Sequence, residues 1–497
     1  MDELSNNKQF KALSLIFIIF SILHVVYATI TMRGMYMDGG FFTLCMLNNI
    51  ANDNYNFIYD PGHPRFFMLM LNQIPVYLAN WALLINNKFA LMMIYSFSHF
   101  ALPLLALLWS WTLCKRTKRN DIFLWNLFVY SALLITFSIF SLVETLIGAT
   151  LHFILWNYLS SNMEYKKRDY LAIVFLVTMM FATYEYVVAL GIIFFFASFH
   201  YVFKEKGLKN QLIKTIIGFG SLGASLFNII MMIKTPGEGG EIIRFLKEAY
   251  DFTYSMWNMN LLISIVTVFL LGFFTLKKEK LTSKGIIFLS IIYACIFIRL
   301  ISSLEISLSP VMETHFRTIP CWLLPIIFTG FYISDLTKKK YNSTVLSNLI
   351  CIVLLCGITQ SAWQMVNTYH WDKNIQYMKN ELQQHNETLY IPSEHTEIAT
   401  FHNRELRRYI WHSTYAFTSI LFSKSYEQKT LLMHYDEEID KGNLTFRKNL
   451  FVKQNIENAI SIPLGTIISI KNKFWDLTNC AKALDRYNKE NNIQTLE

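Results

Sequence analysis

The sequence contains little charge for its length. Only 16% of its 497 residues are Asp, Glu, Lys or Arg, whereas soluble domains carry about 25%. Hydrophobic residues make up 53% of the chain, and the mean hydropathy is +0.32. One soluble core does not bury that much apolar side chain, so the composition excludes an ordinary soluble protein and indicates a membrane protein.

Cysteine is too sparse and too scattered to form a disulfide framework. Cys295, Cys351 and Cys356 lie inside apolar runs, and Cys114 lies in a basic loop. The histidines also lack the close spacing of metal ligands. The first polar segment contains no Asp-x-Asp or Glu-x-Asp motif. No motif therefore supports a metal cofactor, and dependence on a divalent metal is left open.

Acidic residues are fewer than basic ones, and the net charge is +9. The excess does not predict nucleic-acid binding, because the basic residues form short clusters between apolar runs. This is the pattern in which cytoplasmic loops of membrane proteins carry the Lys and Arg residues. The clusters are Lys115 to Arg119, Lys166 to Arg168, Lys204 to Lys214, Lys277 to Lys284, and Lys338 to Lys340.

Long apolar runs are abundant, and a run of about 20 residues crosses the hydrocarbon core of a bilayer. Counting them predicts about eleven spans, with the N-terminus in the cytoplasm and the C-terminus outside. The predicted spans are Leu13 to Ile30, Phe89 to Leu113, Ile122 to Leu142, Thr145 to Leu159, Tyr170 to Ala182, Tyr186 to Phe203, Leu212 to Ile233, Leu261 to Leu276, Ile286 to Ile301, Thr318 to Tyr332, and Val345 to Trp363.

One apolar stretch, Phe66 to Ile85, is interrupted by Asn72, Gln73 and Asn80. Treating it as a span would place the basic cluster Lys115 to Arg119 outside, so we predict an amphipathic helix in the membrane interface. The predicted fold is thus an all-α polytopic membrane protein. Its domains are a transmembrane domain, 1–363, with a first outer loop at 32–88, and a small soluble C-terminal domain, 364–497, of uncertain class.

Three acidic residues near the predicted outer face are candidates for chemistry, because carboxylates near a membrane are costly. Asp38 opens an Asp-Gly-Gly sequence in the first outer loop, which is also a plain turn signal. Glu144 separates two apolar runs, and the alternative is that it only marks a helix end. For Glu185, the alternative is that it lies at the tip of a tight hairpin. The same outer loop also carries Asp53 and the rigid sequence His63-Pro64-Arg65.

A second candidate site is His315-Phe316-Arg317, directly before a span that contains Pro320 and Pro325. Arg at the outer end of a span binds a lipid phosphate through its bidentate fork. The alternative is that Arg317 is an anchor whose charged end reaches the interface.

This arrangement resembles the GT-C superfamily of integral-membrane glycosyltransferases over roughly the first 360 residues. Asp38 matches the family's catalytic acid in the first outer loop, and Glu144 matches a second acid that opens a later span. His63-Pro64-Arg65 matches the start of its membrane-parallel helix. Arg317 with Pro320 is similar to its late basic element. A soluble outer C-terminal domain is also common in that superfamily.

The resemblance implies transfer of a sugar from a polyprenyl-phosphate donor to a glycan, lipid or protein acceptor. It implies Asp38 and Glu144 as catalytic groups, and Arg317, His315 and Arg65 as ligands of the donor phosphate. We place Glu185, Asp53 and His63 near the acceptor. The expected location is the bacterial inner membrane, with the C-terminal domain outside, and the expected partners include membrane lipids but no nucleic acid.

Three alternatives to a glycosyltransferase remain at this point. In a transporter or a flippase for lipid-linked sugars, the same charged groups would line a pathway. A polysaccharide polymerase or ligase would use similar lipid donors. A structural membrane protein would carry out no chemistry. Against a transporter, the sequence has no detectable internal repeat and few charges inside its predicted spans.

Overall fold

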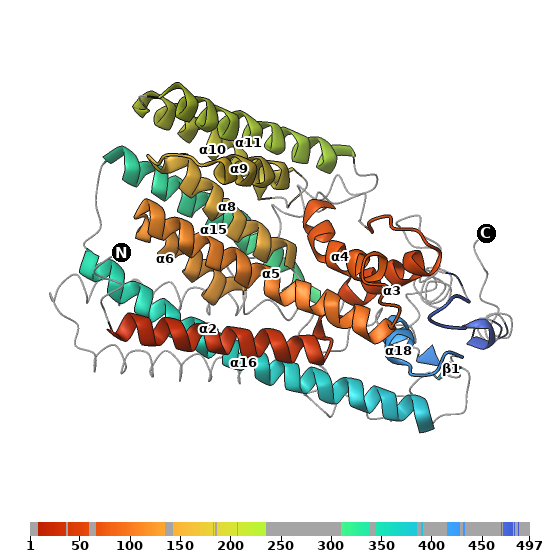
Figure 1. The fold of residues 1–497 in the computed structure, drawn as a ribbon. Coiled ribbons are helices and arrows are strands. Elements are labelled where there is room, and N and C mark those ends of the chain that lie inside the picture. The colour runs from red at the N-terminus through yellow and green to blue at the C-terminus, as the bar shows by residue number, and fades with distance from the viewer. Residues whose placement is uncertain are drawn as a thin grey trace. The chain divides into compact units, whose positions relative to one another are not determined.

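The structure is a computed structural model. It describes residues 8–35, 38–58, 66–134, 143–181, 183, 186–205, 207–234, 310–337, 343–384, 389–390, 415–427, 431–432, 469, 471–480, 482 and 486. The described chain is predominantly helical (Figure 1). It divides into two compact units, which are described separately: unit 1 is 1–25, 61–69 and 100–364, and unit 2 is 26–60, 70–99 and 365–497.

Unit 1 is a bundle of apolar helices. It contains most of α2 (Lys8–Ile30), the second part of α5 (Lys88–Thr117) and the first part of α16 (Ser343–Gln384). Its other elements are α6 (Asn120–Phe128), the π-helix η2 (Val129–Leu134), α8 (Val143–Ser160), α9 (Lys167–Met180), α10 (Val187–Lys204), α11 (Leu208–Lys234) and α15 (Pro310–Thr337).

Unit 2 consists of most of the segment predicted as the first outer loop together with the C-terminal segment. It contains the 3-10 turn η1 (Arg33–Met35), α3 (Asp38–Ala51), most of α4 (Phe66–Trp81) and the short helix α18 (Tyr415–Phe422). The first part of α5 and the last part of α16 also belong to it. Two-residue strands β1 (Leu389–Tyr390) and β2 (Leu431–Leu432) pair in parallel, with Leu389 opposite Leu431.

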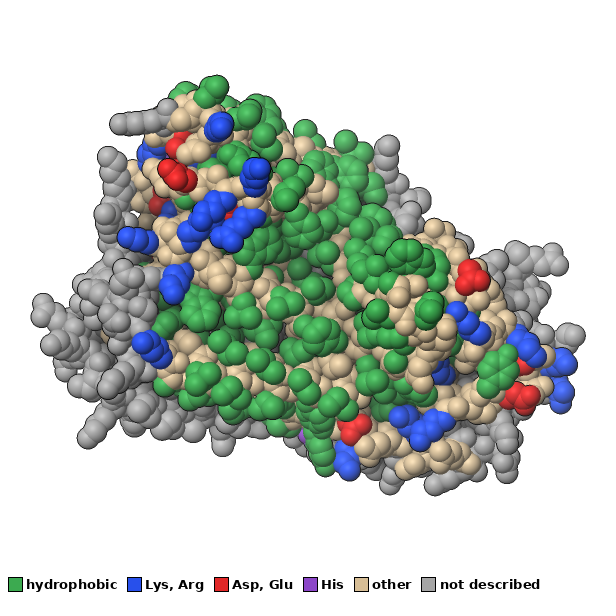
Figure 2. All heavy atoms as spheres, in the orientation of Figure 1, with side chains coloured by type: hydrophobic (Ala, Val, Ile, Leu, Met, Phe, Trp, Pro, Cys, Tyr) green, Lys and Arg blue, Asp and Glu red, His purple; other side chains and the backbone are tan. Residues whose placement is uncertain are grey.

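Five of the described helices are long and apolar enough to cross a membrane. They are Phe10–Ile30, Lys88–Thr117, Val187–Lys204, Leu208–Met231 and Leu346–Asn380. Large apolar side chains stand exposed along them, for example Leu15, Ile22 and Ile30 on α2, and Figure 2 shows hydrophobic side chains over much of the visible face. Exposed apolar patches of this extent mark contact with lipid or partners. The prediction of a helical membrane protein is therefore confirmed.

The total of eleven spans stays a prediction. The predicted spans Leu261 to Leu276 and Ile286 to Ile301 lie outside the described residues. The run predicted from Ile122 is described only as far as Leu134, where α6 is followed by the π-helix η2. The predicted span at Tyr170 lies in α9, which has only 14 residues, and the predicted span at Thr318 lies within α15, whose side chains are described only from Leu323.

Two boundaries differ from the sequence expectation. The first outer loop contains a helix, α3, because a run of apolar residues without proline follows Gly40. The last predicted span ends at Trp363, whereas α16 continues to Gln384. The division between the units falls between Gln364 and Met365, close to the predicted domain boundary. Whether residues 364–497 fold as an independent domain stays a prediction.

The core of unit 1 is an aromatic cluster contributed by α8, α10 and α15. Trp156 is fully buried, and its ring contacts Phe194 at 5.0 Å and Phe328 at 5.3 Å between centroids. Phe153 contacts Phe328 at 4.9 Å. Such offset and edge-to-face pairs add to the packing of large side chains. This cluster holds together helices that are far apart in the sequence.

Small residues allow close packing of α10 against α11. A Cβ atom added at Gly191 would collide with the backbone oxygen of Ser221 and approach the Cβ of Ser225 to 2.7 Å. On α11, an added Cβ at Gly218 would collide with the side chain of Ser198. Membrane helices commonly pack in this way, because small residues let the backbones approach.

Gly191→Ala is therefore expected to destabilise the protein by about 1 to 3 kcal/mol, the range for overpacking a filled interface. Gly330→Ala is the matched control, since nothing lies within 4 Å of a Cβ built there, and Ala favours a helix over Gly by roughly 1 kcal/mol. Thermal unfolding in detergent should show a lower midpoint for the first variant only. Equal midpoints would contradict the close helix packing.

Candidate functional site

The turn that precedes Asp38 is held by buried polar contacts of unit 2. Arg33 in η1 is only 1% exposed, and its Nη1 donates a hydrogen bond to Thr368 Oγ1 at 2.7 Å. The backbone N–H of Gly34 donates to Ser96 Oγ at 3.1 Å. Buried polar groups that are hydrogen-bonded in this way rigidify their surroundings. The turn is thus attached to both α5 and α16.

Packing at the turn is equally close. A Cβ at Gly34 would lie 2.9 Å from the Cα of Ser96, so only glycine fits. The indole Nε1 of Trp371 donates to the carbonyl oxygen of Thr31 at 3.1 Å, which connects α16 to the end of α2. Met32 has a φ of 53° at the turn itself. These contacts hold the turn η1, which ends at Met35, ahead of α3.

Asp38 is the first residue of α3, and its side chain lies outside the described residues. Asp is favoured at a helix start, because its carboxylate accepts hydrogen bonds from free N–H groups and interacts well with the helix dipole. A Cβ at Gly40 would meet the Met35 carbonyl oxygen at 2.6 Å and Leu421 Cδ1 at 3.8 Å. The Asp-Gly-Gly sequence therefore forms the first helical turn of α3, which packs against α18.

Lys88, at the start of α5, hydrogen-bonds to the C-terminal end of helix α18. Its Nζ donates to the carbonyl oxygens of Ile420 at 3.1 Å and Ser423 at 2.9 Å. These carbonyls belong to the end of α18, where a cation is favourable. The ring of Phe422 contacts Trp371 edge to face at 6.2 Å and lies 5.1 Å from Lys379 Nζ.

A second contact joins the C-terminal segment to α3. Asn48 Oδ1 accepts a hydrogen bond from the backbone N–H of Ser469 at 2.8 Å, and Trp475 Nε1 donates to the Ser469 carbonyl oxygen at 3.0 Å. Nearby, Lys473 Nζ donates to Asn86 Oδ1 at 3.4 Å. The first outer loop and the C-terminal segment therefore lie on the same side of any membrane.

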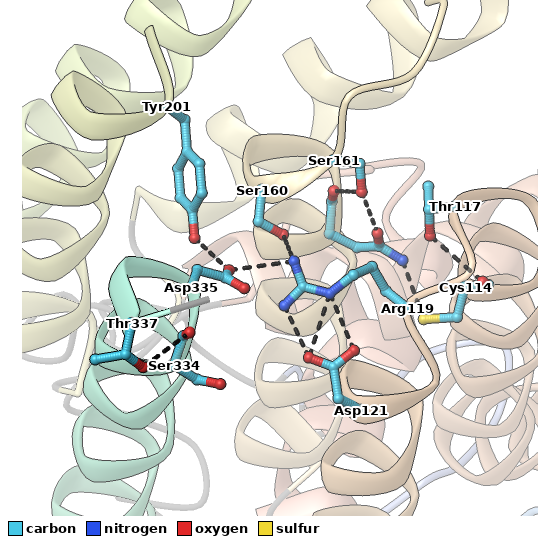
Figure 3. A network of polar contacts seen from close by, with 11 residues as sticks. Cys114, Thr117, Arg119, Asp121, Ser160, Ser161, Tyr201, Ser334, Asp335 and Thr337 are labelled. Atoms are coloured by element: carbon cyan, nitrogen blue, oxygen red, sulfur yellow. Dashed lines mark hydrogen bonds and ion pairs between the residues drawn. The ribbon is translucent and has the colours of Figure 1, made fainter. Parts of the chain in front are cut away.

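A separate polar network lies in unit 1, where four elements end (Figure 3). Arg119 forms an ion pair with Asp121 at 2.8 Å and with Asp335 at 3.2 Å, and it donates to Ser160 Oγ at 3.0 Å. Tyr201 OH donates to Asp335 Oδ2 at 2.6 Å. Burial acts to lower the pKa of Arg119, but the hydrogen bonds and negative charge of Asp121, with the charge of Asp335, outweigh it and raise that pKa.

A neighbouring ion pair joins α5 to the start of α9. Arg116 binds both carboxylate oxygens of Asp169, at 2.8 and 2.7 Å. Burial acts to raise the pKa of Asp169, but the Arg116 hydrogen bond and the backbone N–H of Lys166 lower it below its ordinary 3.8. A carboxyl with a lowered pKa stabilises the fold above its ordinary pKa and loses that contribution as pH falls through the lowered value. The pair therefore persists at mildly acidic pH.

One polar face of unit 1 thus contains the ends of seven described helices, α5, α6, α8, α9, α10, α11 and α15, and three of the predicted basic loops. Glu205 and the fully buried Lys214 form a further ion pair there. Each of four acidic side chains forms an ion pair with a basic side chain of unit 1, namely Asp121, Asp169, Glu205 and Asp335. Exposed cations remain around them, among them Lys115, Lys118, Lys167, Arg168 and Lys209. This face has the charge expected of cytoplasmic loops.

The predicted site residues are described to different extents. Glu144 is the second residue of α8, and His315 and Arg317 lie within α15, but their side chains are outside the described residues. His63, Arg65 and Glu185 are outside them altogether. Asp53 is exposed at a turn with a φ of 53°.

Asp38 belongs to unit 2, whereas Glu144, His315 and Arg317 belong to unit 1. Their convergence on one cavity therefore stays a prediction. Within the described part of the chain, no group of three or more His, Cys, Asp or Glu side chains is arranged to hold a metal ion.

Sequence reasoning missed the residues that hold the Asp38 turn. Arg33 was not among the predicted site residues, although an Arg five residues before a candidate acid was a usable signal. Thr368 and Trp371 had no such signal, because they lie more than 300 residues away and contact the turn only in the folded chain. Comparison with protein-family models, with curated proteins and with solved structures found no match for this chain.

Proposed function

We propose that the protein is a membrane glycosyltransferase that transfers a sugar from a polyprenyl-phosphate donor on the side of the first outer loop. One observation carries the proposal: Asp38 opens a helix whose preceding turn is held rigid by Arg33, Gly34 and Trp371. A general base has to be held in a fixed position relative to its acceptor, and such rigid support provides this.

The proposed reaction breaks the anomeric C–O bond to phosphate and forms one to the acceptor oxygen or nitrogen. Asp38 accepts the acceptor proton, and the bonding electrons leave with the phosphate. Arg317, His315 and Arg65 stabilise that departing charge, and Glu144 positions the acceptor. Attack from the opposite side inverts the anomeric configuration. Helix α18 of the C-terminal segment packs beside Gly40 and so supports the first turn of α3, where Asp38 lies.

The test uses purified protein in liposomes with a radiolabelled polyprenyl-phosphate sugar and a mixture of candidate acceptors. A new glycosidic bond, found by chromatography of the labelled product, is the expected result. Movement of labelled lipid across the bilayer without any new bond would replace the proposal by a flippase. Elongation of one product into long chains would indicate a polymerase.

The membrane topology is a separate prediction. Lys88 and Asn48 hydrogen-bond to the C-terminal segment, which supports a common side of the membrane for all three, and α5 is long enough to cross from Lys88 to the basic loop after it. We expect an impermeant thiol reagent, added to intact cells, to label cysteines introduced at Asn54 and Lys379. Cysteines at Lys118, Lys167 and Lys339 should react only after permeabilisation. Labelling of Lys118 in intact cells would refute this topology.

Donor binding is expected to depend on the guanidinium of Arg317. Arg holds a phosphate through two parallel hydrogen bonds, which Lys does not reproduce. Arg317→Lys should weaken binding of the polyprenyl-phosphate sugar by about 1 to 3 kcal/mol, the range for hydrogen bonds to charged groups. Arg168→Lys, at an exposed arginine outside the proposed phosphate site, is the comparison. Unchanged binding in Arg317→Ala would reassign Arg317 to anchoring at the interface.

A further inference from the structure

Four neutral polar side chains lie buried inside the unit 1 bundle, and we call them the polar cluster. Each is at most 2% exposed, and they are Ser21 of α2, Ser131 of η2, and Gln360 and Ser361 of α16. Within the described part of the chain, the three hydroxyls and both polar atoms of the Gln360 amide form no hydrogen bond. A buried amide or hydroxyl without a partner costs free energy, and the hydrocarbon of a bilayer supplies no partner.

The polar cluster lies where α2, η2 and α16 meet. A Cβ atom built at Gly357 of α16 would lie 2.7 Å from Ser131 Oγ and 2.5 Å from Cε2 of Phe17 on α2. The ring of Phe17 also contacts that of Tyr130 edge to face, with 6.3 Å between centroids. Figure 1 shows α2 and α16 running beside each other. Gly357 is thus the point at which the three elements touch.

The other members of the cluster lie one helical turn from this contact. Helices α2 and α16 both pass from unit 1 into unit 2 along the chain, so they run in the same direction. Ser21 follows Phe17 by four residues, and Gln360 and Ser361 follow Gly357 by three and four. Residues three or four apart share a helix face and differ in height by one turn, about 5.4 Å. The four side chains therefore occupy neighbouring positions.

Helical hydrogen bonding is interrupted at the same level. Ser131 belongs to the π-helix η2, and such segments frequently mark functional sites. Pro103 of α5 has no N–H to donate to the carbonyl one turn before it. Leu107 and Leu127 line one groove, and α5 and α6 are joined by a short turn and run in opposite directions. One turn back from Leu107 and one turn on from Leu127 thus bring Pro103 and Ser131 to one level.

Hydroxyl groups elsewhere in the bundle find a partner in their own helix. Thr359 Oγ1 donates to the carbonyl oxygen of Leu355 at 3.0 Å, on the same helix as Gln360. Ser198 Oγ donates to the carbonyl oxygen of Phe195 at 2.7 Å. This bond to the preceding turn is the usual one for a hydroxyl inside a helix. The hydroxyls of the polar cluster do not form it in the described structure, so their partner has to come from another source.

We propose that the polar cluster holds internal water, so that unit 1 contains a hydrated site at the interruptions of α5 and α6. A buried water molecule has about three polar partners and binds donors and acceptors alike. The cluster offers both, since hydroxyl and amide N–H groups donate and the amide oxygen accepts. A bound cation would contact only oxygens and leave Gln360 Nε2 without a partner, which favours water. This inference does not depend on the proposed glycosyltransferase activity.

The first test is X-ray radiolysis of the full-length protein in phosphatidylcholine nanodiscs, in water enriched in oxygen-18. Radiolysis converts bound water to hydroxyl radicals, which oxidise the nearest side chains before they diffuse away. Phe17 and Tyr130 report on the site, because both are at most 5% exposed and their rings lie beside it. Peptide mass spectrometry measures how fast the heavy oxygen enters each ring.

We expect Phe17 and Tyr130 to be oxidised severalfold faster in the unsubstituted protein than in a double variant with Gln360→Leu and Ser131→Ala. Thr359→Val is the matched control and should leave both rates unchanged, because its hydroxyl bonds within α16. Equal rates in the unsubstituted protein and the double variant would overturn the proposal. Ser131→Ala alone repeats the comparison with a smaller change of shape.

Thermal unfolding gives a second and independent readout. Gln360→Leu removes the amide while keeping a side chain of similar size. In a hydrated site the bound water loses a partner and the midpoint falls, whereas in a dry site an unpaired amide is removed and the midpoint rises. A rise would overturn the proposal. Stabilisation of the unsubstituted protein by sodium chloride, but not by choline chloride, would overturn it in favour of a bound cation.

Discussion

Asp38→Asn is expected to abolish sugar transfer while the protein remains folded and inserted. An amide has nearly the shape of a carboxylate but does not accept the acceptor proton, and general-base catalysis contributes about 10² to 10⁴-fold. The turnover number should fall by that factor, while binding of the donor is retained. Single-turnover assays with a saturating labelled donor measure the chemical step directly.

The same substitution distinguishes catalysis from structure at α3. Asn is itself a good residue at a helix start, so a merely structural Asp38 would tolerate it with little loss. Glu164→Gln is the control, because Glu164 is an exposed carboxylate outside the proposed site. If Asp38→Asn transferred sugar at the wild-type rate, Asp38 would not be the base and the proposed reaction would lose its central residue.

Arg119→Gln is expected to destabilise the protein by about 3 kcal/mol, the lower end of the range for breaking a buried ion pair. Arg119 is 18% exposed and pairs with both Asp121 and Asp335. Its loss leaves two carboxylates close together without their shared cation. The loop between α5 and α6 would then separate from the end of α15, and the midpoint of thermal unfolding in detergent should fall.

Lys115→Gln is the control, because Lys115 is an exposed cation at the end of α5. Its loss should leave the unfolding midpoint unchanged. A double-mutant cycle with Asp335→Asn isolates the pair itself, since removing both partners should cost less than the sum of the single changes. Strict additivity would show that Arg119 and Asp335 do not interact in the folded protein.

Helix limits inside the membrane followed closely from hydropathy. The sequence predicted spans from Tyr186 to Phe203 and from Leu212 to Ile233, and the helices are α10, Val187–Lys204, and α11, Leu208–Lys234. Hydropathy succeeds there because each backbone group in a membrane helix bonds within its own segment. It failed at α3, whose apolar run is too short for a span, and at the end of α16, where the helix continues past the apolar run.

The candidate site was predictable only as a list of residues. Asp38 stood out because a carboxylate follows a span, but the turn that holds it depends on Ser96 and Thr368. No local pattern distinguishes those two hydroxyl groups from other polar residues of α5 and α16. The hydrogen bonds between Gln73 and the backbone of Ile58 were likewise not predictable, because a glutamine in an apolar run has the same local pattern whether its side chain points to water or to a loop.

The sequence by itself determined the membrane class, the helical fold and the basic loops, because hydropathy and charge act within a segment of about 20 residues. The tertiary structure decided which polar groups pair. It joins Arg119 to Asp335 across 216 residues and Lys88 to the carbonyl of Ile420 across 332 residues. Such partners depend on how helices pack, and a buried polar group accepts whichever partner the packing brings within hydrogen-bond distance.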